Sequence, residues 1–108
     1  MLFRSPEELS EWVPDYAEAV ALTRRTVGLA IELGVLDSTV RVDPGDDPAR
    51  GSFALAAAAP LGPFDRYRIL ASTSVLERLQ LLIEVLHDLE EVLHFRLAAG
   101  GDDAGTDT

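Results

Sequence analysis

Proline and glycine are distributed very unevenly along this chain of 108 residues. All six prolines lie between Pro6 and Pro63, and residues 64–99 contain neither proline nor glycine. Proline lacks a backbone donor and clashes with the preceding helical turn, so a helix is seldom built across it. The distribution therefore predicts short helices in the first part of the chain and one uninterrupted helix in the second.

Helix start signals divide the first part further. Ser5-Pro6 and Asp47-Pro48 each combine an N-cap residue with a proline at the first helical position. Gly34 is a suitable helix stop, and residues 35–46 are the poorest helix candidate. Helices are expected at residues 6–13, 15–33, 48–59 and 64–71, with breaks at Pro14 and Pro60.

The last helix has the strongest start signal, because Ser74 and Glu77 form a capping box. It is expected to run to about Leu97. Seven apolar residues alternate along it at spacings of four and three: Val75, Leu79, Leu82, Leu86, Leu89, Leu93 and Leu97. More than half of its circumference is apolar, so it is expected to pack between two or more helices or to complete an interface.

These patterns predict an all-α fold, a small bundle of about four helices with a long C-terminal helix at about 74–97. Residues 1–99 are expected to form one helical domain. Residues 100–108 contain three acidic residues and no basic one, and they are predicted to be a disordered acidic tail.

Charge and composition exclude several functions. The chain has 19 acidic and 9 basic residues, which argues against nucleic acid or an anionic membrane as a partner. All the basic residues are arginine, so P-loop, Schiff-base and Ser–Lys chemistry cannot be built. We expect a non-enzymatic protein without a catalytic residue or cofactor. The absence of cysteine and of an export signal favours the cytoplasm, and no apolar run is long enough for a transmembrane helix.

Two histidines allow a metal-site hypothesis. His87, Glu91 and His94 have the i, i+4, i+7 spacing of two imidazoles and a carboxylate on one helix face. A solvated polar face is the preferred interpretation, and no metal site is predicted.

Aromatic residues are the main candidates for binding. Most are expected to be core residues, whereas Trp12, in the proline-punctuated N-terminal segment, is expected to be half exposed. If an apolar groove exists, the candidate peptide-binding residues are Phe64, Tyr67, Leu86 and Phe95. The arginine clusters at 24–25 and at 66 and 68 are expected to balance nearby acids.

Residues 47–97 combine an Asp-Pro helix start, an alanine-rich helix, a Pro60-Leu61 break and the segment DRYRIL at 65–70. This order resembles the C-terminal helical part of the LON substrate-binding domain, with DRYRIL similar to a DRQRLL-like motif. That domain forms the N-terminal domain of the bacterial protease Lon and also occurs in stand-alone proteins. The family-motif residues, expected to be structural, are Pro60, Leu61, Asp65, Arg66, Arg68 and Leu70. The β-rich half of the domain, with its PLFPLG-like motif, is not in this sequence.

The resemblance implies a non-enzymatic, protease-associated module that recognises unfolded or hydrophobic polypeptide segments. A partner chain could supply the β-rich half. The alternative is a small acidic helical protein whose apolar face forms a homodimer.

Overall fold

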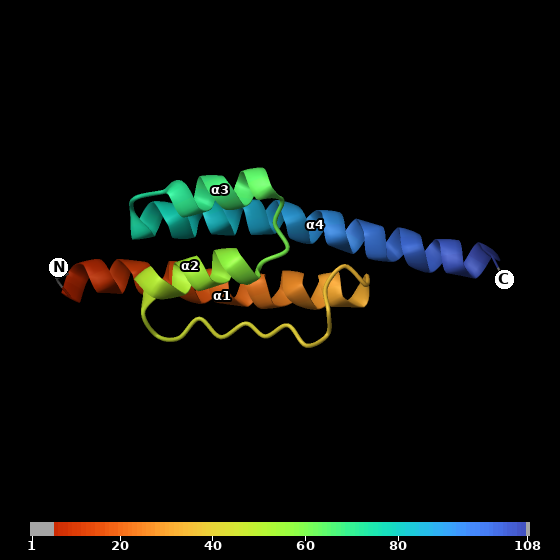
Figure 1. Cartoon of the computed structure of the whole chain (residues 1–108), viewed down its shortest axis with the longest axis horizontal. Helices are drawn as coiled ribbons and strands as arrows, with labels where there is room; N and C mark the ends of the chain where they lie inside the picture. Colours follow the sequence, from red (N-terminus) through yellow and green to blue (C-terminus); the bar gives the residue numbers. More distant parts are fainter. Residues whose placement is uncertain (1–5, 108) are drawn as a thin grey trace.

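The computed structural model describes the backbone of residues 6–107 and the side chains of residues 14–100. Within that part it contains four helices and no strand: α1 (Pro6–Glu32), α2 (Pro48–Ala58), α3 (Pro63–Ala71) and α4 (Val75–Asp107). α1 and α4 lie side by side and run in the same direction; α2 lies on α1, and the antiparallel α3 lies on α4 (Figure 1). The predicted all-α bundle with a long last helix is confirmed.

Local signals set the ends of α1 and α2. Gly34 has φ +79° and ends α1, and the amide of Val35 donates to the carbonyl of Ala30 at 2.8 Å. This is the left-handed helix stop that glycine favours. The chain then returns along α1 as an irregular segment (Figure 1). The carboxylate of Asp47 accepts a bond from the amide of Ala49 at 3.1 Å and begins α2, as predicted.

Two helices are longer than predicted. α1 continues through Pro14, whose ring is exposed, because proline has a helical φ and its insertion removes a single backbone bond. α4 continues from Leu97 to Asp107 across Gly100 and Gly101, because glycine lowers helix propensity but keeps its backbone donor.

Two predictions concern side chains outside the described residues. Trp12 lies before residue 14, and nearly all of the segment from 100 to 108 lies beyond residue 100. The half-exposed tryptophan and the domain division at residue 99 stay predictions, whereas the backbone of residues 100–107 is helical, as part of α4.

The core is formed by one face of each helix. Its fully buried large aliphatic side chains are Leu22, Leu55, Ile69, Leu79, Leu82 and Leu86. Each contributes about 1.5–3 kcal/mol through burial. Three of the six come from the leucine seam of α4, which confirms the prediction that this helix packs between several neighbours.

α1 and α2 approach closely at Gly51. A Cβ atom at this position would collide with the side chain of Tyr16, so the ring packs directly on the backbone of α2. The Tyr16 hydroxyl donates to the carbonyl of Gly45 at 2.8 Å and ties the return segment to α1. Burial, together with the charges of nearby aspartates, raises the pKa of Tyr16 and favours its neutral, donating form.

Substitution Gly51→Ala should destabilise the fold by about 1–3 kcal/mol, because the new methyl group must displace the Tyr16 ring. Gly28→Ala is the control. That position is helical and open, so alanine should stabilise the protein by up to about 1 kcal/mol. Urea unfolding of both variants measures the difference. Equal shifts of the two midpoints would contradict the close packing.

Arg66 holds α3 on the end of α2. α3 has nine residues, and Ile69 is its one fully buried side chain in the described part of the chain. Arg66 donates from Nε to the carbonyl of Ala56 at 3.1 Å and from Nη2 to the carbonyl of Ala59 at 2.7 Å. Carbonyls at a helix C-terminus need donors from outside the helix, and a cation there is favourable to the helix dipole.

Arg78 holds the other end of α3. It lies in the first turn of α4 and is 5% exposed. Its Nη2 donates to the carbonyl of Ser72, which ends α3, at 2.6 Å, and its Nη1 donates to Oγ of Ser52 in α2 at 3.1 Å. The guanidinium carbon lies 3.9 Å from the centre of the Phe53 ring, a cation–π contact. Burial lowers the pKa of Arg78, which has no carboxylate partner among the described side chains.

Substitution Arg66→Ala should cost about 2–3 kcal/mol of stability, because it removes two charge-assisted bonds and leaves the carbonyl of Ala56 without its donor, whereas that of Ala59 keeps the amide of Leu61. Arg50→Ala, at an exposed position of α2, should change stability by less than about 0.5 kcal/mol. Thermal unfolding of both variants checks this. A loss for Arg66→Ala no larger than for Arg50→Ala would show that α3 is held by other contacts.

Candidate binding groove between α3 and α4

A groove follows the seam between α3 and α4. One hollow of about 290 Å³ lies at the start of α3, and another of about 550 Å³ lies at its end. Both are lined by Arg68 and Glu84, so they adjoin along the seam. We call this surface the α3–α4 groove. Its floor is apolar: the aliphatic side chains are Leu61, Leu81, Val85, Leu89 and Val92.

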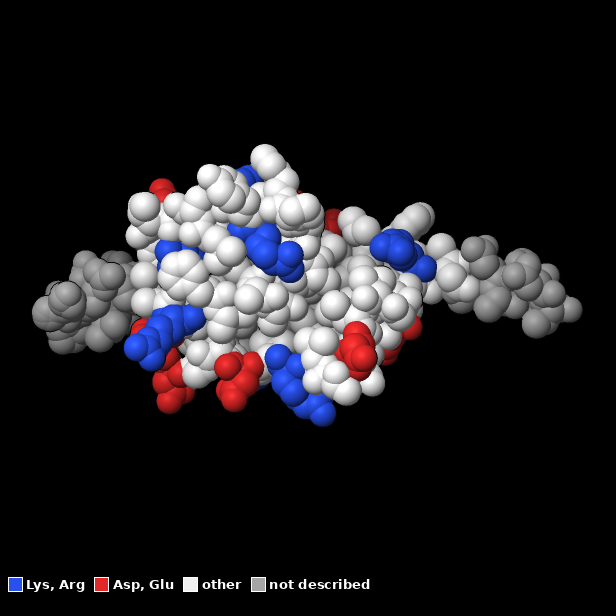
Figure 2. All heavy atoms as spheres, viewed as in Figure 1, with Lys and Arg blue, Asp and Glu red and all other residues white. Residues whose placement is uncertain are grey.

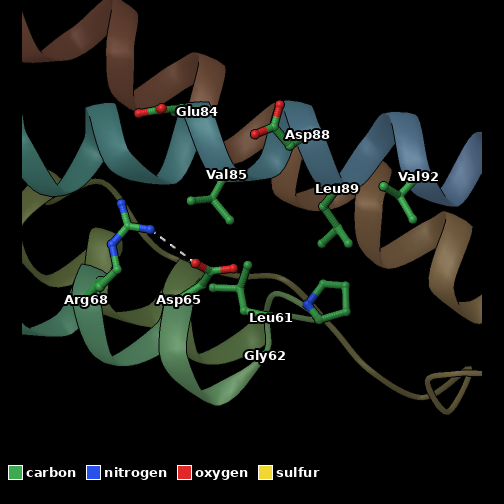
Figure 3. Close-up of a pocket in the computed structure, with 10 residues that line it drawn as sticks. Leu61, Gly62, Asp65, Arg68, Glu84, Val85, Asp88, Leu89 and Val92 are labelled. Carbon is green, nitrogen blue, oxygen red and sulfur yellow. Dashed lines mark hydrogen bonds and ion pairs between the residues drawn. The ribbon is translucent and has the colours of Figure 1, made fainter.

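Figure 3 shows the hollow at the start of α3. Val85, Leu89 and Val92 point from α4 toward Leu61 and the first turn of α3. All three are only partly covered, because the short α3 begins beside them and does not extend along the rest of α4. An apolar surface that no other helix covers is available to a ligand.

Aromatic side chains border the groove on the α3 side. Tyr67 lines the larger hollow and is 72% exposed. Phe64 is equally exposed, one turn earlier on the same face. The guanidinium of Arg68 lies 5.8 Å from the centre of the Phe64 ring and 3.2 Å from a carboxylate oxygen of Asp65. On the face that includes α2 and α3, uncharged side chains cover a broad area between isolated arginines (Figure 2).

Acidic side chains border the groove on the α4 side. Glu77 and Glu84 line the larger hollow, and Glu84 and Asp88 line the smaller one. Neither Glu84 nor Asp88 forms an ion pair within residues 14–100. Glu77 completes the N-terminal cap of α4 through its amide, which donates to Oγ of Ser74 at 3.3 Å. Its carboxylate accepts a bond from Ser72 Oγ at 3.2 Å.

The four predicted binding residues differ in their accessibility and in their position relative to the groove. Tyr67 lines the groove, Phe64 is exposed one turn earlier on α3, and Phe95, 74% exposed, lies one turn beyond Val92 on α4. Leu86 is fully buried in the core and is not accessible to a ligand. The period of the α4 seam places Leu86 on the core face, and this signal was sufficient to assign it there.

The family-motif residues fall into two groups. Pro60, Leu61, Asp65 and Arg68 line the smaller hollow. Arg66 binds carbonyls of α2, and Leu70 is partly exposed on α3. The prediction that the arginine clusters balance acids holds for Arg25 and Arg68. It is wrong for Arg24, which donates to the carbonyl of Val42 at 3.2 Å, and for Arg66, whose partners are carbonyls at the end of α2.

The histidines of α4 face separate carboxylates. His87 Nε2 lies 3.2 Å from Oε2 of Glu18, and His94 Nε2 lies 3.8 Å from Oε2 of Glu90. Within the side chains that the structure describes, no three His, Cys, Asp or Glu residues are grouped as metal ligands would be. His87 therefore joins α4 to α1, whereas His94 and Glu90 lie four residues apart on α4 itself.

An ion pair fastens the same contact. Arg25 Nε donates to Oε2 of Glu90 at 2.7 Å, and this hydrogen bond holds the pKa of Glu90 below its ordinary value. A carboxylate whose pKa is lower in the folded than in the unfolded state stabilises the fold. This stabilisation is complete at pH values above the unfolded-state pKa, which is about 4.3 for glutamate. The contribution is lost as the pH falls through the lower, folded-state pKa.

Substitution Arg25→Gln should therefore reduce stability at pH 7 by up to about 1 kcal/mol, with a smaller deficit below about pH 4. Arg41→Gln is the control, because Arg41 is exposed and donates to carbonyls of Ser38 and Val40. Urea unfolding between pH 3 and pH 7 gives the two differences. A deficit for Arg25→Gln that is independent of pH would contradict the role of Glu90.

Comparison with protein-family models, curated proteins and solved structures found no match to this chain. Of the helices that the structure describes, none has an apolar stretch long enough to cross a membrane.

Proposed function

We propose that this protein is a non-enzymatic polypeptide-binding module whose α3–α4 groove receives an apolar segment of another chain. The observation that carries the proposal is an apolar floor lined on the α3 side by the largely exposed Tyr67, with the equally exposed Phe64 one turn earlier on α3. Exposed aromatic residues beside an apolar depression are typical of protein interaction sites. Grooves between helices commonly accept a helical or extended segment through such contacts.

The resemblance of residues 47–97 to the LON substrate-binding domain supports the same function. On this proposal the module recognises unfolded or hydrophobic segments in association with a protease, and a partner chain supplies the β-rich half. The cysteine-free composition agrees with a place in the cytoplasm.

A second candidate function is homo-oligomerisation. It is favoured by Val92 and Phe95, which are exposed on the part of α4 beyond the start of α3. Pairing of two copies through this stretch would bury both side chains. Light scattering across a dilution series separates the candidates, because a dimer dissociates on dilution, whereas a monomer keeps one mass.

The peptide-binding proposal predicts that fluorescent hydrophobic peptides bind the monomer saturably, with a dissociation constant of tens of micromolar or lower. The double substitution Phe64→Ala and Tyr67→Ala should weaken binding about tenfold or more, because both aromatic contacts are lost. Stability should change little, since both side chains are largely exposed. Fluorescence anisotropy measures the binding.

Val35→Ala is the matched control, because Val35 is an exposed apolar residue outside the groove. The Val35→Ala variant should bind the same peptides with the affinity of the unsubstituted protein. Absence of saturable binding, or equal losses in the two variants, would refute the proposed function.

A further inference from the structure

We infer that the occupant of the α3–α4 groove is a basic amphipathic helix, about four turns long, supplied by another protein. This inference rests on the proposed function and specifies the partner. Three properties of the groove lead to it: its length along α4, the helical spacing of its floor and the charge of its border.

The length and spacing of the groove fit a helix. Its lining residues extend along α4 from Glu77 to Val92, which is about 22 Å at 1.5 Å per residue. Leu81, Val85, Leu89 and Val92 repeat at spacings of four, four and three, the period of one helix face. A helix whose apolar residues recur at the same spacings can interdigitate with such a row.

The charge of the border selects a basic partner. Four acidic side chains line the groove, Asp65, Glu77, Glu84 and Asp88, and one basic side chain, Arg68, is paired with Asp65. Covering Glu84 and Asp88 with a neutral segment would remove part of their hydration without giving them a partner. Lysine or arginine beside the apolar face of the incoming helix would satisfy both carboxylates.

The same charges argue against a second copy in this groove. A two-fold interface places the same patch of each subunit opposite its counterpart. Two copies of the α3–α4 groove would then bring their acidic borders together, in a chain whose net charge is −10. The basic partner therefore has to come from a different polypeptide.

The test uses the full chain and two designed helical peptides of about 16 residues, long enough for about four turns. Both carry leucine at the spacing of one helix face; one has lysine beside this stripe, and the other has glutamate at the same positions. Fluorescence anisotropy at low and high salt gives the affinities. The lysine peptide should bind about tenfold or more tightly than the glutamate peptide, with a preference that salt reduces.

Charge reversal locates the effect. The double variant Glu84→Arg, Asp88→Arg should lose the preference for the lysine peptide or prefer the glutamate peptide. The double variant Asp43→Arg, Asp46→Arg is the matched control: it changes the net charge equally at exposed positions that do not line the α3–α4 groove. It should keep most of the preference, because exposed charges beyond a Debye length are screened.

The outcomes separate the inference from the proposed function. Binding of neither peptide, together with no binding of hydrophobic peptides, would overturn the proposed function. Equal binding of both peptides would refute the inference that the partner is basic, but the proposed function, a groove that binds apolar segments, would stand. Self-association of the chain that the Glu84→Arg, Asp88→Arg variant strengthens would identify a second copy as the occupant and would also overturn the inference.

Discussion

The arrangement of the bundle depends on arginine side chains that bind helix-end carbonyls. α3 has nine residues, and Ile69 is its fully buried side chain in the described part of the chain, so polar contacts contribute strongly to its position. Arg66 and Arg78 tie it to the end of α2 and to the start of α4. A guanidinium can donate two bonds in fixed directions, which a lysine ammonium does less well. The arginine-only basic composition thus has a structural use at these two positions.

The groove follows from a mismatch of length between α3 and α4. α4 has 33 residues and an apolar face that is wider than α1 can cover, whereas α3 has nine residues. The apolar surface that remains beside α3 becomes the floor of the groove. Glu84 and Asp88 lie next to this surface on α4, so an apolar contact and an acidic border occur together. A ligand must match both properties.

Much of the fold could be predicted from the sequence, because its strongest signals are local. Asp47 and Gly34 mark helix ends, and the spacing of Leu79, Leu82 and Leu86 identifies the core face of α4. The continuation of α1 through Pro14 was not predicted, because a proline with its helical φ removes only one backbone bond and the helix can continue across it.

The groove was harder to predict, because it depends on which neighbour covers which part of a helix. Helical periodicity places Leu86 on the core face of α4. It does not show that α3 leaves the side chains of Val85, Leu89 and Val92 partly exposed. The partners of Arg66 and Arg78 are backbone carbonyls and a hydroxyl group, which have no charge pattern in the sequence. Residue type made Phe64 and Tyr67 binding candidates, but most aromatic residues were expected in the core, and that expectation is wrong for both, which are 72% exposed.

The most direct measurement is a nuclear magnetic resonance titration of the isotope-labelled protein with the lysine-bearing amphipathic peptide. We expect saturable shifts of backbone amides along α3 and at residues 77–95 of α4, with little change at the exposed residues Ala17 and Ala21 of α1. Shifts centred on α1, or an unchanged spectrum at saturating peptide, would contradict this expectation.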